Sequence, residues 1–155
     1  MYMVHLTNKH ICDVFPVFDD TDRLTEVCLI RPEEFDIKPV KKEHEEICAY
    51  LESYPDGECP LKFDELVFEG RSDFHKTVYK NLFNLPKGEV ITYGRLAEVS
   101  GSKKAARAVG TAMGTNPYPL IVPCHRVVRS DSLGNYSSGV HKKVKLLEAE
   151  GAHWK

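Results

Sequence analysis

The amino-acid sequence predicts an α+β protein with two domains: a small first domain of strands and one helix, and a second domain that is mostly helical. Short runs of β-branched and aromatic residues fill the first 31 positions, which favours strands. Apolar residues recur at helical spacing in residues 41–54 and in several segments after residue 72. Gly70-Arg71-Ser72-Asp73 separates the two kinds of pattern. We therefore predict domains at residues 1–70 and 71–155.

The composition excludes several classes of protein. With 155 residues, 42% hydrophobic and 28% charged, the chain resembles a soluble globular protein rather than a disordered one. We find neither an apolar segment of about 20 residues nor a secretory leader, so we expect a cytoplasmic protein, or a nuclear one in a eukaryote, without membrane association. An odd number of cysteines without close pairs argues against a disulfide framework and a zinc knuckle: Cys12, Cys28, Cys48, Cys59 and Cys124. We expect a reducing compartment and no bound metal.

In the first domain we predict a hairpin or meander followed by a helix. Residues 10–18 and 24–30 are the strands, and the acidic cluster at residues 19–22 is the turn between them. Pro16 predicts an edge position for the first strand, because proline lacks the N–H that a central strand needs. Residues 41–54 are predicted to form a helix that Pro55-Asp56-Gly57 ends, with four residues facing inward: Ile47, Tyr50, Leu51 and Tyr54.

In the second domain we predict four helices. Ser72 or Asp73 caps a helix over residues 74–83, and Thr92 caps another over residues 93–99 that Gly101 closes. Ser102 begins the third, which runs to Gly114, and the last covers residues 140–150 with Val144, Leu146 and Leu147 inward. Residues 66–68 form a short strand or a linker. The turn-rich segment 130–139 is predicted to be a loop that can close over a pocket.

The second and third of these helices form a helix-turn-helix pattern, with basic residues opening the later one. The pattern occurs in many proteins that do not bind DNA, so charge is the second indication. Residues 1–90 carry 11 Lys+Arg and 19 Asp+Glu, a net charge of −8, whereas residues 91–155 carry 10 and 4, a net charge of +6. A basic face can meet a polyanion or dock on the acidic half, and charge alone leaves both open.

A cysteine and two basic residues interrupt an apolar run at residues 120–128, which we expect to be buried. The free pKa of a thiol is about 8.5, and a neighbouring imidazole or cation lowers it and makes the sulfur a nucleophile. Pro123 restricts the backbone before Cys124 and helps to aim the sulfur. We favour a nucleophile over a buried structural cysteine, because a buried strand has no structural use for His125 and Arg126 beside the thiol.

The motif Pro123-Cys124-His125-Arg126-Val127 stands among others in a fixed order: Thr92-Tyr93-Gly94, Arg107-Ala108-Val109-Gly110, Asn116-Pro117 and Gly134-Asn135-Tyr136-Ser137. From about Gly70 to Gly151 the chain resembles the O6-alkylguanine-DNA alkyltransferases. The resemblance implies a ribonuclease-H-like N-terminal domain and a winged-helix-like C-terminal domain with the helix-turn-helix. It also implies DNA repair by one irreversible transfer of the alkyl group from O6-alkylguanine to Cys124, without a cofactor, and O4-alkylthymine as a second possible substrate.

The resemblance implies a role for each matching residue. Cys124 is the nucleophile, His125 the base that acts through a water, and Glu150 the residue that orients His125. Tyr93 lends its phenol proton to the departing guanine, and Asn116 braces the turn under the active site. Without the resemblance we would interpret Glu150 as an exposed acid and Tyr93 as a packing residue.

The remaining implied residues concern DNA and the alkyl pocket. Arg107 fills the place of the extruded nucleotide, and the helix-turn-helix enters the minor groove of double-stranded DNA through small residues: Ala105, Ala106 and Gly110. The pocket residues are Val127, Tyr136, Ser137, Met113 and Pro119. Without the resemblance, Arg107 would be a surface salt bridge. We expect a monomer.

Two other classes of function compete with alkyl transfer. A non-catalytic relative that only recognises the lesion would lack the cysteine, which is present here. A cysteine hydrolase generally has its histidine far from the cysteine in sequence. The chain also departs from the family pattern at Ser138, where glycine is frequent, and at Tyr79, where tryptophan is frequent.

Overall fold

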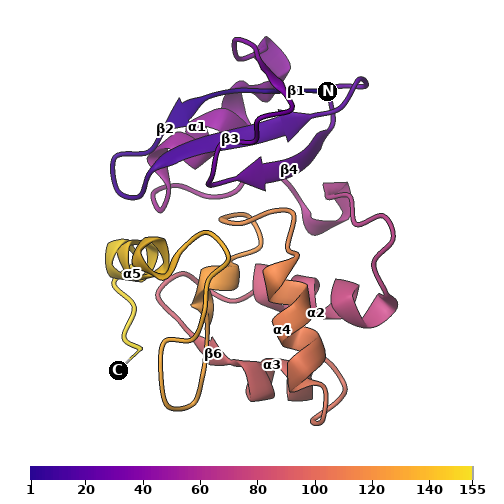
Figure 1. The fold of residues 1–155 in the computed structure, drawn as a ribbon, viewed down its shortest axis with the longest axis vertical. Helices are drawn as coiled ribbons and strands as arrows, with labels where there is room; N and C mark the ends of the chain where they lie inside the picture. The colour runs from indigo at the N-terminus through magenta and orange to yellow at the C-terminus, as the bar shows by residue number, and fades with distance from the viewer. Residues whose placement is uncertain (155) are drawn as a thin grey trace.

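The computed structural model describes residues 1–154. A sheet lies at one end of the molecule and a group of helices at the other (Figure 1). We call the stretch from strand β1 (Tyr2–Met3) to the 3-10 helix η2 (Phe63–Glu65) the N-terminal part, and the stretch from helix α2 (Asp73–Phe83) to helix α5 (Val140–Ala149) the C-terminal part. The α+β class predicted from the sequence is therefore confirmed.

The sheet is built around β3 (Asp13–Phe18), which pairs antiparallel with β1 (Tyr2–Met3), β2 (Leu6–Thr7) and β4 (Leu24–Cys28). β5 (Asp36–Ile37) adds to β1 in parallel. The carboxylate of Asp19 closes the β3–β4 turn by accepting hydrogen bonds from the backbone N–H groups of Thr21 and Arg23 at 2.9 and 3.0 Å. The predicted hairpin is confirmed.

The prediction that Pro16 marks an edge strand is wrong, because β3 is the central strand. Pro16 pairs with Val27 of β4 on one side. On the other side its carbonyl accepts a hydrogen bond from Val4 N–H at 3.0 Å, at the interruption between the pairing of β3 with β1 and its pairing with β2. The missing N–H of Pro16 faces this interruption, so a central position costs little ladder pairing.

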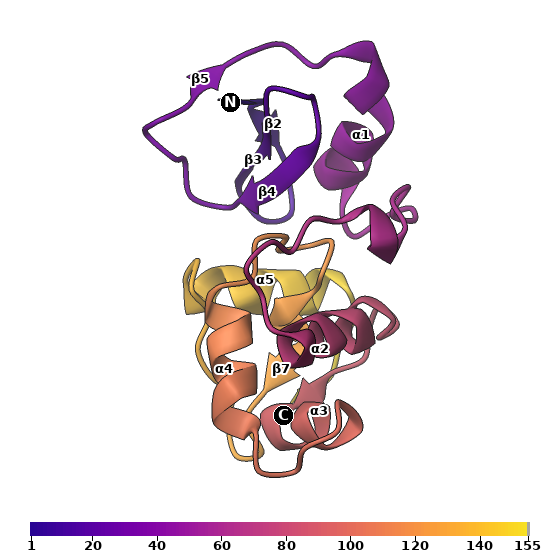
Figure 2. The same cartoon turned by 90° about the vertical axis from the view of Figure 1, so that its right-hand side faces the viewer.

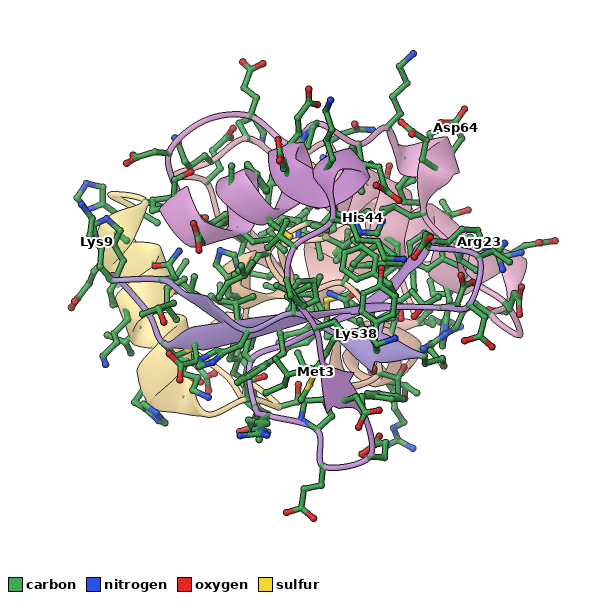
Figure 3. All side chains as sticks on the ribbon, turned by 90° about the horizontal axis from the view of Figure 1, so that it is seen from above. Met3, Lys9, Arg23, Lys38, His44 and Asp64 are labelled. Atoms are coloured by element: carbon green, nitrogen blue, oxygen red, sulfur yellow. The ribbon has the colours of Figure 1, made fainter. Side chains whose placement is uncertain are left out.

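One helix covers the sheet in the N-terminal part. The 3-10 helix η1 (Lys42–His44) leads into α1 (Glu45–Ser53), whose residues Ile47 and Leu51 are buried (Figure 2). Seen from above, His44 lies between the start of α1 and the strands (Figure 3). Its ring stacks on the ring of Phe18, with the two ring centroids 3.8 Å apart. Tyr54 follows α1 and is buried as predicted, whereas Tyr50 is half-buried. After the 3-10 helix η2 (Phe63–Glu65), residues 66–68 form a linker and not a strand.

The C-terminal part follows the predicted order of helices. α2 (Asp73–Phe83) begins at Ser72, whose hydroxyl caps the N–H of His75, and α3 (Tyr93–Val99) begins at Thr92, which caps Arg95. α4 (Ala106–Gly114) starts later than predicted, because residues 102–105 form a turn closed by Ala105 N–H and the Ser102 carbonyl at 3.1 Å. Its basic residues Lys103 and Lys104 therefore stand exposed before the helix.

Two short strands and a last helix complete this part. β6 (Ile91–Thr92) pairs in parallel with β7 (Val127–Val128), which brings the start of α3 beside the cysteine segment. α5 (Val140–Ala149) buries Leu146 and Leu147. No helix within residues 1–154 combines the length and apolar character needed to cross a bilayer.

The two parts share one hydrophobic core and several polar contacts. The hydroxyl of Tyr118, a buried residue of the C-terminal part, donates to the Leu24 carbonyl at 2.9 Å and accepts from Val67 N–H at 2.9 Å. Val27 N–H donates to the Pro117 carbonyl at 2.8 Å. The free edge of β4 is thus satisfied by the loop that leads to Cys124.

Leu82→Ala is expected to lower the free energy of unfolding by about 2–5 kcal/mol, because Leu82 is fully buried on α2 and its removal leaves a cavity. Chemical denaturation measures the change. Val99→Ala on the 44% exposed end of α3 is the control and should stay within about 0.5 kcal/mol of wild type. Equal losses in the two variants would contradict the assignment of α2 to the core.

Candidate functional site

A cavity of about 590 Å³ opens between the helix-turn-helix and the loop that follows β7. Its lining comes from three places in the chain: the start of α3, one face of α4, and the segment from Cys124 to the loop. Of the predicted site residues, eight line it: Tyr93, Ala106, Arg107, Gly110, Met113, Cys124, Tyr136 and Ser137. Segments about 30 residues apart in sequence are thus brought together around one sulfur atom.

A tight turn holds the backbone just before Cys124. Asn116 braces this turn: its side-chain N–H donates to the Val122 carbonyl at 2.8 Å, and its side-chain oxygen accepts from the backbone N–H two residues on at 3.0 Å. Within the turn, Leu120 has φ +77°, a left-handed conformation that non-glycine residues rarely adopt. The 1% exposed side chain of Leu120 packs in the core, which holds the residue in this conformation.

Residues Cys124–Arg126 form a 3-10 helix, η3, and not the extended segment expected from the sequence. The Arg126 N–H donates to the Pro123 carbonyl at 3.0 Å, so the chain turns at the cysteine before it enters β7. The expected burial is confirmed, since every residue from 120 to 128 is buried.

The resting pKa of Cys124 is raised and not lowered, contrary to the expectation from its basic neighbours. Burial raises the pKa of the thiol, and the side chain of Asn116 and the charge of Lys143 only partly oppose this. The physical reason is desolvation: a thiolate loses its hydration when it is enclosed by protein. At neutral pH Cys124 is therefore a thiol, and a base must remove its proton before the sulfur can attack.

His125 and Glu150 form a buried pair behind the cysteine. The Nε2 atom of His125 lies 2.9 Å from Oε2 of Glu150, and both side chains are fully buried. Since a carboxylate can only accept, Nε2 carries the proton, and Nδ1, which has no partner among residues 1–154, is the free lone pair. Burial lowers the pKa of His125 although Glu150 opposes the shift. His125 is thus neutral at pH 7, as a base has to be.

Arg126 holds Glu150 and does not face the thiol, so the interpretation that it activates Cys124 is wrong. Its Nε and Nη2 atoms donate to the two oxygens of Glu150, both at 2.9 Å, and Nη1 donates to the Leu85 carbonyl at 2.7 Å. Burial alone would raise the pKa of Glu150, but hydrogen bonds from His125 and Arg126 outweigh it and lower that pKa to about 2. Glu150 is therefore a charged, buried carboxylate and not an exposed acid.

Lys143 is a second buried cation that the sequence analysis missed. It lies on the inner face of α5, and its Nζ donates to the carbonyls of Val127 at 2.7 Å and Asn135 at 3.0 Å. These bonds tie β7 to the loop over the cavity. Burial lowers the pKa of Lys143 to about 8. The sequence did not indicate this lysine as a buried residue, because the spacing of the apolar residues of α5 alone predicts the helix and its inner face.

The loop and the helix-turn-helix supply the outer wall of the cavity. The hydroxyl of Tyr136 is buried without a hydrogen-bond partner within residues 1–154, and burial raises its pKa well above the usual value. Arg107 is exposed at the first turn of α4, on the cavity wall. The remaining lining residues were not predicted as site residues, although the first three belong to the matched motifs: Thr92, Gly94, Asn135, Gly114, Arg129 and Ser130.

The structure does not place every predicted pocket or DNA residue in the lining. Val127 is buried in β7 and Pro119 in the turn before Cys124. Ala105 precedes α4 and is half-buried. These three residues lie behind or beside the cavity wall, so any contact with a substrate has to come from their backbone or from a surface outside the cavity.

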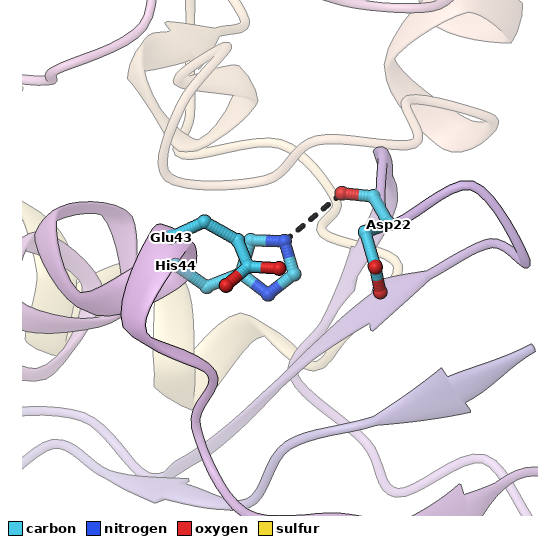
Figure 4. Close-up of side chains that lie close together, drawn as sticks. All are labelled: Asp22, Glu43 and His44. Carbon is cyan, nitrogen blue, oxygen red and sulfur yellow. Dashed lines mark hydrogen bonds between the residues drawn. The ribbon is translucent and has the colours of Figure 1, made fainter.

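A separate group of potential metal ligands lies in the N-terminal part (Figure 4): one ligand atom each from Asp22, Glu43 and His44 falls within 4.8 Å of the others. The Asp22 carboxylate already accepts from Lys41 Nζ at 2.6 Å and from the Tyr2 hydroxyl at 2.7 Å. The ring Nε2 of His44 contacts the Asp22 carbonyl at 2.9 Å. Lys41 compensates the charge of Asp22 and Nε2 of His44 is engaged, whereas Nδ1 of His44 is buried without a hydrogen-bond partner within residues 1–154.

Comparisons with known proteins agree with this geometry. The family model of the 6-O-methylguanine DNA methyltransferase DNA-binding domain matches residues 73–152, more than half of the chain. A methylated-DNA–protein-cysteine methyltransferase of Thermococcus kodakarensis is 54% identical over 88 residues, 56% of this chain and 49% of that protein. The match thus spans about half the length of that relative. A probable methylated-DNA–protein-cysteine methyltransferase of Acanthamoeba polyphaga mimivirus is 37% identical over 86% of this chain and 87% of its own.

Solved structures extend the likeness to the whole fold. A crystal structure of Mycobacterium tuberculosis OGT in complex with DNA has a TM-score of 0.74 at 30% identity, covering 95% of this chain and 92% of that one. An O6-methylguanine-DNA methyltransferase from Pyrococcus kodakaraensis has a TM-score of 0.73 at 31% identity, covering 97% and 99%. With the family model matched across the cysteine, the helix-turn-helix and α5, the chain belongs to the 6-O-methylguanine DNA methyltransferase family.

Proposed function

We propose that the chain repairs DNA by transferring the alkyl group of O6-alkylguanine to Cys124 in a single, irreversible reaction. The observation that carries the proposal is the placement of Cys124: its residue lines a cavity walled by the helix-turn-helix, with the bonded His125–Glu150 pair directly behind it. A soft nucleophile at carbon and a base with a free lone pair are what this transfer requires. We also propose O4-alkylthymine as a second candidate substrate.

In the proposed step, the sulfur of Cys124 attacks the alkyl carbon, the S–C bond forms and the C–O6 bond of guanine breaks. The thiol proton passes to Nδ1 of His125, through a water, and Glu150 stabilises the imidazolium that results. Tyr93, half-buried on the cavity wall, supplies a proton to the departing guanine anion. A proton then returns from the His125 imidazolium, through water, to the Tyr93 phenolate, so the net products are a thioether on Cys124 and unmodified guanine, which carries the equivalent of the thiol proton. Because a thioether is not readily hydrolysed, the protein acts once.

Double-stranded DNA is the proposed partner, bound through the minor groove by the helix-turn-helix. Ala106 has only a methyl side chain and Gly110 has none on the face of α4 that walls the cavity, which permits a close approach of the DNA backbone. The net charge of +6 over residues 91–155 supports phosphate contacts. Extruding a base costs a few kcal/mol, and we propose that Arg107, which lines the cavity, occupies the vacated stack.

We also propose that residues 1–70 form a ribonuclease-H-like domain and residues 71–155 a winged-helix-like domain. The β-rich start with one covering helix supports the first assignment, and α3, α4 and the β6–β7 pair support the second. We propose that the protein acts as a monomer in the cytoplasm, or in the nucleus of a eukaryote. We use the word relay for the three residues Cys124, His125 and Glu150. In the proposed reaction neither the pocket nor the relay requires a metal or an organic cofactor.

Duplex DNA labelled on the methyl group of O6-methylguanine tests the reaction. We expect one label per chain at saturation, because the thioether blocks a second turnover, and none with Cys124→Ser. Cys48→Ser, which removes another buried cysteine, should leave transfer unchanged. Tight binding without transfer would support a lesion-recognition module instead, and several turnovers per chain would support a cysteine hydrolase.

Arg107→Ala is expected to slow repair of duplex DNA by about tenfold or more. The reason is that extrusion of the base costs a few kcal/mol, and the variant has no arginine side chain to fill the vacated place in the stack. Reaction with the free alkylated base should change little, because no base has to be extruded. Arg31→Ala, a loss of an exposed arginine in the N-terminal part, is the charge-matched control. Equal losses with duplex DNA and with the free base would refute the flipping role.

Glu150→Gln is expected to lower the free energy of unfolding at pH 7 by about 3–5 kcal/mol, because it leaves Arg126 buried and without a counter-charge. The pKa of Glu150 is lowered from 4.5 to about 2 in the folded protein, so its stabilisation is present above pH 4.5 and is lost as the pH falls toward 2. The difference in the free energy of unfolding between wild type and variant, which is the gap measured here, should therefore narrow as urea denaturation is repeated from pH 7 to pH 3. The exposed Glu148→Gln is the control, and a gap that is constant with pH would contradict the charged state of Glu150.

A further inference from the structure

Tyr54 brings the N-terminal part of the chain into the catalytic relay. It follows the last turn of α1, is 1% exposed, and stands 71 positions before His125. Its ring meets the His125 ring edge-to-face, with centroids 6.0 Å apart and planes at 89°. Nothing in the C-terminal motifs indicates this contact, because a tyrosine at the end of an amphipathic helix is normally a core residue.

The hydroxyl of Tyr54 sits at the centre of the relay's hydrogen bonds. It donates to Oε2 of Glu150, the same oxygen that accepts from His125 Nε2 at 2.9 Å and from Arg126 Nη2 at 2.9 Å. It accepts from Arg126 Nη2 at 3.2 Å, and its oxygen lies 3.2 Å from His125 Nε2. One carboxylate oxygen thus has three donors, one of which comes from outside the C-terminal part.

We propose that Tyr54 is a positioning residue of alkyl transfer: its hydroxyl fixes the Glu150 carboxylate, which in turn orients His125 with Nδ1 free to accept the thiol proton. The proposal rests on the function proposed above. It assigns to the N-terminal part a direct share in the chemistry, through a side chain that touches the relay but neither the DNA nor the sulfur.

The hydroxyl also limits how strongly Glu150 can stabilise a protonated His125. Donation from Tyr54 withdraws electron density from Oε2 of Glu150. This oxygen is therefore a weaker hydrogen-bond acceptor for the Nε2–H of His125. The other charged or titratable groups around the ring are Arg126 from η3, Lys143 from α5, and the Tyr136 ring at 6.5 Å from the loop. Of these groups, Arg126 also contacts the hydroxyl, because its Nη2 donates to the Tyr54 oxygen at 3.2 Å, so the part of the effect that passes through Glu150 is isolated by comparison with the Glu150→Gln background.

Tyr54→Phe removes the hydroxyl and keeps the ring. We expect the pKa of His125, followed by NMR of its ring nitrogens in the free protein, to rise by about 0.5 unit or more. The acid limb of the transfer rate against pH should move up by the same amount, so that transfer on that limb is about threefold slower. A purely structural role would change stability without moving either curve.

Tyr118→Phe is the matched control, because it removes another buried hydroxyl that bonds across the two parts, away from His125. It should lower the melting temperature about as much as Tyr54→Phe and leave the pKa of His125 unchanged. A shift of equal size in both variants would overturn the proposal, as would an unchanged pKa in Tyr54→Phe.

A second variant keeps the test decisive if Tyr54→Phe does not fold. Replacing Tyr54 with 3-fluorotyrosine retains the hydroxyl and makes it a stronger donor, so the pKa of His125 should fall, and a rise or no change would overturn the proposal. In Glu150→Gln, the further replacement of Tyr54 with 3-fluorotyrosine should no longer shift that pKa, and a persisting shift would show that the hydroxyl does not act through Glu150. The NMR titration needs no substrate, so failure of wild type to transfer methyl would sink the proposed function while this measurement still decided the role of Tyr54.

Discussion

The buried carboxylate of Glu150 is the interaction on which the rest of the site depends. It accepts hydrogen bonds from Arg126, His125 and Tyr54, so the end of α5, the cysteine segment and the end of α1 meet at one charge. A carboxylate without these donors would be costly to bury, and the donors without the carboxylate would be left unpaired. The network is therefore stable only when complete, which couples the assembly of the fold to the assembly of the relay.

The second constraint is the enclosure of Cys124. The same burial that raises the pKa of the thiol lowers that of His125, so both groups are uncharged at rest. A neutral thiol is protected from unspecific reactions, and a neutral imidazole is ready to accept its proton. In the proposed reaction the pair becomes charged only when a substrate is in place, and the fixed charge of Glu150 would then stabilise the imidazolium.

Local patterns in the sequence were sufficient for much of the fold. The caps at Ser72 and Thr92, the Asp19 turn and the helical spacing of α2 and α5 each act within about one turn of chain, and the structure has them where they were predicted. The errors came from long-range pairing. Pro16 is in a central strand because a partner strand breaks opposite it, and Arg126 pairs with an acid 24 positions away. No local rule contains such partners.

The sequence by itself determined the helix-turn-helix, the order of the motifs and the identity of the candidate nucleophile, because backbone propensities and a run of matching residues are properties of neighbouring positions. Only the tertiary structure decided the charge states and the membership of the site. Whether a thiol, an imidazole or a lysine is charged depends on how much water the fold removes and which partners it supplies. For the same reason Tyr54 and Lys143, which look like ordinary helix residues in sequence, become parts of the site in the folded chain.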